Sequence, residues 1–107
     1  MKIAVASNGP HWSSDVADVF GRSPYFLVFD EEAGSAQVVA NPGAGITSGS
    51  GVGAAQLLLD HGVDLLAAPK VGPQAHKVLS EGGVRFCFCK GMQARAALKE
   101  ARREETV

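Results

Sequence analysis

The chain has 107 residues, of which 46% are hydrophobic and 20% are charged, as is typical of one globular domain, 1–107, with a core of its own. The formal net charge is −1, which argues against general binding of nucleic acid. No apolar run approaches the roughly 20 residues that a membrane span needs, and the apolar start over 2–7 is too short for a signal peptide. We therefore expect a cytoplasmic protein that binds neither nucleic acid nor a membrane.

The predicted elements follow the order β-β-β-α-β-α-β-α. An apolar strand over 2–7 leads into a long loop, and strands over 25–29 and 37–40 form a hairpin across a polar turn. The pattern of apolar residues then predicts helices over 52–61, 73–80 and 92–103, with strands between them over 63–68 and 84–88. The charged tail over 102–107 is expected to fray.

This order predicts an α/β fold with a five-stranded mixed sheet. Helical crossovers after the hairpin imply parallel pairing among the first, third, fourth and fifth strands, with the second strand antiparallel. Ligands of open α/β sheets bind at the carboxyl ends of the strands. Four loops, Asn8–Ser14, Asn41–Gly53, Pro69–Pro73 and Cys89–Met92, are therefore expected to meet at one edge and to form the site.

A glycine-rich segment, Asn41–Gly53, leads into the first predicted helix. Glycine lets the backbone approach a ligand closely, and a helix N-terminus supplies free N–H donors. The segment lacks the Gly-Lys-Ser/Thr ending of a Walker loop and is not a clean dinucleotide fingerprint. It predicts an anion site that includes Gly49, Ser50, Gly51 and Gly53, unless the segment is only a flexible crossover loop.

Cations are expected at the same edge. Arg22 lies in the long loop, Lys70 follows the fourth predicted strand, and Lys90 follows the fifth. Together with a glycine-rich helix start they favour an anionic ligand, although each residue taken alone can also be a solvated surface charge.

Donors for a soft metal ion also lie near this edge: Cys89, Met92, His11 and His76. Cys87 and Cys89 are two residues apart in an extended segment, which places them on one face at roughly 6.5–7 Å and predicts free thiols. Cys87 is expected in the core, whereas Cys89 can belong either to the core or to the site.

Catalysis finds little support in the sequence. The strand over 2–7 carries no acidic residue, and the serines near it lack an evident partnership with a histidine and an acid. Asp15 and Asp18 lie in the long loop and could act as a general base, but no nucleophile is paired with them in the sequence. We therefore expect a protein that is not an enzyme.

Four segments in this order resemble the dinitrogenase iron–molybdenum cofactor biosynthesis family, which includes the cofactor carriers of nitrogenase assembly. They are Met1–Ser7, Phe20–Phe26, Gly49–Leu58 and Gly72–Ala75, and the resemblance spans residues 1 to about 100. It implies a ribonuclease H-like, three-layer α/β/α fold. It also implies a non-catalytic domain that binds a metal–sulfur cluster.

The resemblance allows more than one cluster. A molybdenum–copper sulfide cluster is the cargo of the orange protein branch, and an iron–sulfur or iron–molybdenum precursor is the other choice. Arg22 matches the Phe-Gly-Arg motif and is the best single candidate for contacting an anionic cluster. Many members carry histidine directly before this motif, where this chain has Val19.

The leading hypothesis is therefore a carrier that holds the cluster at the carboxyl ends of the strands and serves a partner ATPase or a cluster-accepting protein. One alternative is a regulatory scaffold that docks a partner such as an ATPase without metal. A nuclease is suggested by fold analogy alone. A copper chaperone built on Cys87 and Cys89 is the last alternative.

Overall fold

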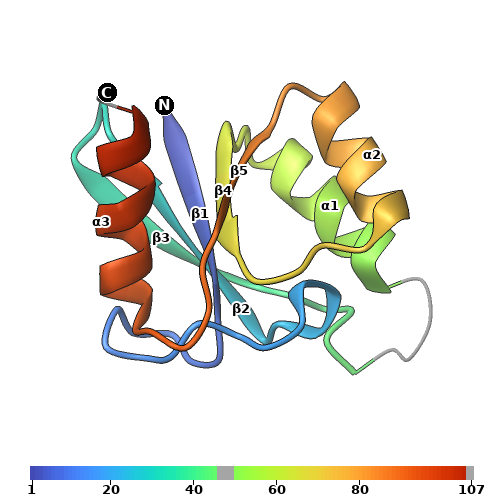
Figure 1. Cartoon of the computed structure of the whole chain (residues 1–107), viewed down its shortest axis with the longest axis horizontal. Helices are drawn as coiled ribbons and strands as arrows, with labels where there is room; N and C mark the ends of the chain where they lie inside the picture. Colours follow the sequence, from blue (N-terminus) through green and yellow to red (C-terminus); the bar gives the residue numbers. More distant parts are fainter. Residues whose placement is uncertain (46–49, 106–107) are drawn as a thin grey trace.

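The computed structural model describes residues 1–45 and 50–105, and the predicted element order is confirmed there (Figure 1). The strands are β1 (Lys2–Ser7), β2 (Tyr25–Asp30), β3 (Ser35–Ala40), β4 (Leu65–Ala68) and β5 (Arg85–Phe88). The helices are α1 (Ser50–Asp60), α2 (Pro73–Glu81) and α3 (Ala94–Glu105), and a 3-10 turn, η1 (Phe20–Arg22), lies in the first long loop.

The strands form one mixed sheet in the order β3-β2-β1-β4-β5. β1 is antiparallel to β2 and parallel to β4, and β4 is parallel to β5. β1, β3, β4 and β5 share one direction, as predicted. However, β3 is joined to the sheet as the antiparallel neighbour of β2, not through a parallel pairing. The short turn between β2 and β3 keeps these two strands adjacent, since consecutive antiparallel strands need no crossover.

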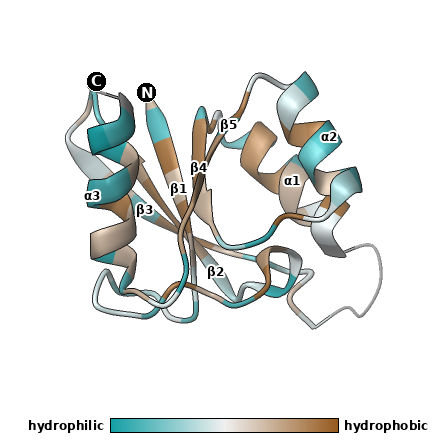
Figure 2. Cartoon of the chain, viewed as in Figure 1, coloured by the Kyte–Doolittle hydropathy of each residue, from teal (hydrophilic) through white to brown (hydrophobic). Residues whose placement is uncertain are grey.

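The sheet is the middle of three layers. α1 and α2 cover one face and α3 covers the other (Figure 1). Side chains of β1 alternate between the two faces: Ala4 and Ala6 pack toward α1 and α2, whereas Ile3 and Val5 pack toward α3. In Figure 2 the hydrophobic colouring follows the strands and α1, and the hydrophilic colouring concentrates on α2 and α3. This arrangement explains why β1 is apolar at both odd and even positions.

Local contacts mark the ends of α1 and α3. α1 stops where Gly62 adopts a φ of +71°, and the Gly62 amide bonds to the Leu59 carbonyl at 3.0 Å. α3 continues through Glu105, two residues past its predicted end. Within the predicted tail, Arg102 donates to the Glu31 carboxylate at 3.1 Å and lies 5.2 Å from the Phe29 ring centroid. Among the described residues, no helix is long and apolar enough to cross a bilayer.

Candidate functional site

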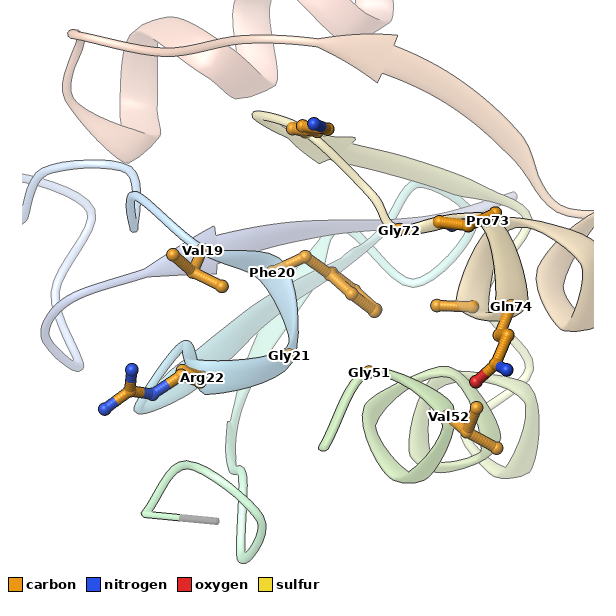
Figure 3. Close-up of a pocket in the computed structure, with 11 residues that line it drawn as sticks. Val19, Phe20, Gly21, Arg22, Gly51, Val52, Gly72, Pro73 and Gln74 are labelled. Atoms are coloured by element: carbon orange, nitrogen blue, oxygen red, sulfur yellow. The ribbon is translucent and has the colours of Figure 1, made fainter. Parts of the chain in front are cut away.

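A hollow of about 380 Å³ opens where η1, α1 and α2 meet (Figure 3). Its lining comes from residues 19–22 around η1, Gly51 and Val52 of α1, Lys70 after β4, and residues 72–75 at the start of α2. η1 follows the carboxyl end of β1, and Lys70 lies two residues beyond β4. The hollow therefore lies at the predicted edge of the sheet, on the side covered by α1 and α2.

Two helix N-termini face this hollow. Gly51 and Val52 lie in the first turn of α1, and Gly72 precedes Pro73, the first residue of α2 (Figure 3). The N–H groups of a first helical turn lack intrahelical acceptors and carry the positive end of the helix dipole. Neither first turn contains an acidic residue, and Gly72 supplies no side-chain cap to α2. The start of α2, which has no side-chain cap, is therefore available to an external anion.

Two cations add to this field. Arg22 and Lys70 are exposed and line the hollow, and the described residues of the lining include no carboxylate. Arg22 also borders a second hollow of about 210 Å³, where Asp18 lies. In Figure 3 the Arg22 side chain extends away from Gln74 and Val52. Arg22 therefore borders both hollows, and its guanidinium is directed away from the α1 and α2 side of the larger one.

The rim also presents apolar side chains. Val19 and Val52 remain 53% and 39% exposed, which is unusual for valine in a folded domain. Beneath them Phe20 is buried against Phe26, with ring centroids 5.4 Å apart. A ligand in the hollow thus meets positive charge and exposed hydrocarbon together.

Buried polar side chains fix the turn that carries Val19 and Arg22. The Asn41 side-chain amide donates to the carbonyls of Gly21 at 3.1 Å and Ser23 at 2.9 Å. The Ser23 hydroxyl accepts from the Ser7 amide at 3.0 Å and donates to the Tyr25 carbonyl at 2.7 Å. The sequence analysis did not identify these residues as important for the position of the turn. Asn41, a polar residue directly after a predicted strand, was the one sequence feature that could have indicated such a role.

The structure brings together three of the predicted anion-site residues, Arg22, Gly51 and Lys70. Gly53 lies farther along α1 and Lys90 follows β5; both are exposed and neither borders this hollow. Ser50 begins α1. Gly49 lies outside the described residues. Val52 and Gln74 were not singled out from the sequence, because their place in the lining depends on how α1 and α2 pack.

The predicted soft donors do not gather in the hollow. His76 lies on α2 and stacks on Phe86, with ring centroids 4.3 Å apart. His11 is exposed in the first loop. Cys89 and Met92 belong to the apolar cluster beneath α3. In the described part of the chain, no three His, Cys, Asp or Glu side chains form a group that could hold a metal ion.

Both cysteines belong to the core. Cys87 and Cys89 are each 3% exposed, are free thiols as predicted, and have sulfur atoms 3.5 Å apart. Burial raises the pKa of Cys87 to about 12 and also raises the pKa of Cys89. Both side chains are therefore neutral thiols at pH 7, and Cys89 lies on the opposite face of the sheet from the hollow.

These features define a small α/β protein with a mixed five-stranded sheet and a positively charged hollow between two helix starts. The sequence pattern of the family described as dinitrogenase iron-molybdenum cofactor matches residues 1–104. The chain therefore belongs to this family, as the resemblance indicated.

Solved structures agree with this assignment. The apo form of the orange protein from Desulfovibrio gigas is 30% identical and has a TM-score of 0.90, over 97% of this chain and 88% of that one. A Thermotoga protein described as a candidate NifB protein is 33% identical and has a TM-score of 0.84, over 95% of this chain and 87% of that one. Among curated proteins none matches this chain.

Proposed function

We propose that this protein is a non-catalytic carrier that binds an anionic metal–sulfur cluster, without a covalent bond, in the hollow between η1, α1 and α2. The observation that carries the proposal is the convergence of two helix N-termini with Arg22 and Lys70 on a lining whose described residues include no carboxylate. Such a surface stabilises negative charge through N–H donors and cations.

The lining favours a soft cluster over a small hard anion. A thiometallate presents negative charge together with polarisable sulfide surfaces, so it can contact Arg22 and Lys70 as well as the exposed Val19 and Val52. Family membership and the similarity to an orange protein support the same cargo class. A molybdenum–copper sulfide cluster and an iron–sulfur or iron–molybdenum precursor both have this chemistry.

The lining also suits a carrier that must release its cargo. Its described residues include no cysteine, histidine or methionine, so the cluster is held by charge, hydrogen bonds and apolar contact. None of these requires breaking a metal–protein bond when the cluster passes on. A cluster-accepting protein or an ATPase that drives the transfer is the partner this implies.

The test is cluster uptake under anaerobic conditions. Purified protein is mixed with tetrathiomolybdate and copper(I), desalted, and assayed for molybdenum per chain and for a visible charge-transfer band. Arg22→Ala and Lys70→Ala should each weaken retention about 10- to 100-fold, since a hydrogen bond to a charged group contributes about 1.5–3 kcal/mol. Lys99→Ala, which removes an exposed cation from α3 outside the hollow, is the matched control.

One result would count against the proposed site, and another against the carrier role itself. If Arg22→Ala, Lys70→Ala and the double variant retain as much molybdenum as Lys99→Ala, the cluster does not lie in the hollow. If the wild-type protein takes up neither thiomolybdate with copper nor an iron–sulfur precursor, yet binds a partner ATPase at full affinity without metal, the scaffold alternative is correct.

A further inference from the structure

The sulfur atoms of the chain gather away from the hollow. The sequence contains two cysteines and two methionines. Cys87 and Cys89 belong to the apolar cluster beneath α3, and Met1 and Met92 pack against that same cluster. The hollow borders the other apolar cluster, because Ala75 of its lining packs toward α1 and α2. The sheet thus separates a sulfur-rich region from the proposed cluster site.

The two thiols are close enough to share one ion. Their sulfur atoms are 3.5 Å apart within a hydrophobic surrounding. A thiolate sulfur lies about 2.3 Å from a bound d¹⁰ ion such as zinc, so two sulfurs on one ion are at most about 4.6 Å apart. The observed separation falls inside this limit, and it corresponds to a bent arrangement that leaves one side of the ion open to a third donor.

We infer that Cys87 and Cys89 form a buried site for a soft monovalent cation, copper(I), and that Met92 is the candidate third donor. Thiolate and thioether sulfur select copper(I) over hard cations. Zinc is a poor match, because a structural zinc site takes four ligands and no group of three or more His, Cys, Asp and Glu that could hold a metal ion was found among the described residues.

The charge near the pair also suits a cation. Glu104, an exposed residue of α3, places a negative charge near both thiols. A cysteine with its ordinary pKa is protonated at pH 7, so binding proceeds as Cu⁺ + 2 RSH → [Cu(SR)₂]⁻ + 2 H⁺. The metal keeps its oxidation state, and the two protons leave to the buffer.

The experiment is an anaerobic titration of the reduced, folded protein with copper(I) against a copper(I) chelator of known affinity. One copper per chain should bind, with an ultraviolet sulfur-to-metal charge-transfer band, release of two protons per copper in weak buffer at pH 7, and a higher melting temperature. A higher melting temperature would show that the folded state binds the ion better than the unfolded chain does. The titration contains neither molybdenum nor sulfide, so its outcome is independent of cluster uptake.

Variants assign the donors. Loss of an outer-shell partner typically costs 10- to 100-fold in metal affinity, so Cys87→Ala and Cys89→Ala should each cost at least about 100-fold and remove the band. Met92→Leu should cost less. Val16→Ala, which removes buried volume from the same cluster without removing sulfur, is the control for lost packing. Cys87→Ser and Cys89→Ser repeat the test if an alanine variant does not fold.

Three results would overturn this inference: no copper uptake by the folded protein, copper that lowers the melting temperature, or binding that survives in both single-cysteine variants. The first would leave the pair as core packing. The second would show that copper binds the Cys-Phe-Cys segment only when the chain is unfolded.

Discussion

Val19 stands at the mouth of the hollow, one residue before η1, with 53% of its surface exposed. We predict that Val19→His places an imidazole donor there and slows cluster loss to a chelator several-fold, because a metal–nitrogen bond is added to charge and apolar contact. The exposed position should keep the change in unfolding free energy within about 0.5 kcal/mol. Molybdenum retained over time in a chelator challenge measures the effect.

Val19→Ala is the comparison, since it shortens the same side chain without adding a donor. It should lose the cluster as fast as the wild-type protein or faster. If Val19→His behaves like Val19→Ala, the position contacts no metal and the cluster lies elsewhere in the hollow.

At the residue scale, the charged members of the site were predictable and the apolar members were not. Arg22 lies in a recognisable motif and Lys70 lies two residues beyond a predicted strand, so topology alone places both at one edge. Val52 and Gln74 border the hollow only because α1 and α2 begin beside each other. Cys89 was ambiguous because side-chain alternation places it with Cys87 but does not say which face α3 covers.

At the element scale, the starts of α1 and α2 approach each other through small residues. A Cβ atom added to Gly51 would lie 3.4 Å from the Cβ of Ala75, the upper limit of a tight contact. We predict that Gly51→Ala leaves thermal stability equal or slightly higher, since alanine favours a helix over glycine by up to about 1 kcal/mol. The same methyl group should weaken cluster retention, because it occupies the lining. Thermal melts and molybdenum assays on one preparation measure both effects.

Gly53→Ala distinguishes a cluster site in the hollow from a site formed by the glycine-rich segment itself. Nothing lies within 4 Å of a Cβ added to Gly53, and Gly53 does not border the hollow. If the hollow is the site, only Gly51→Ala weakens retention. If Gly53→Ala weakens it equally, the glycine-rich segment itself holds the cluster, as the sequence alone suggested.

The elements themselves were largely predictable, because apolar periodicity and turn residues define each one locally. Predicted and observed bounds differ by up to two residues at each end, for example 37–40 against Ser35–Ala40 for β3. That difference arises because Ser35 and Ala36 are exposed edge positions whose pairing with β2 leaves no apolar signature. β3 pairs only with β2 in the sheet. This pairing depends on the order of the strands in the sheet, which local periodicity does not encode.

At the scale of the whole molecule, the central sheet separates the positively charged hollow from the buried thiols. Arg22, Lys70 and the starts of α1 and α2 line the hollow, and the thiols lie beneath α3. Net charge is −1, so an anionic cluster gains no attraction from the molecule as a whole and depends on the local field of Arg22 and Lys70. That field is screened beyond a Debye length of about 10 Å at 0.1 M salt, so the proposed cluster uptake should be more sensitive to ionic strength than the proposed thiol ligation.

Alkaline pH should destabilise the whole fold through its buried thiols. Burial raises the pKa of Cys87 from 9.0 to about 12 and raises that of Cys89, so above pH 9 the unfolded chain loses protons that the folded chain retains. The stability that the thiols contribute is therefore fully present below pH 9 and falls as pH rises above 9, by up to about 1.4 kcal/mol per pH unit for each thiol, and for Cys87 this fall continues to about pH 12. Denaturant unfolding at pH 8, 9 and 10 measures the slope, and the double variant Cys87→Ala, Cys89→Ala should show a shallower one. The two proteins share every other ionisable group, so the difference in slope isolates the thiols. Equal slopes would mean that the thiols ionise as readily in the folded protein as in the unfolded chain.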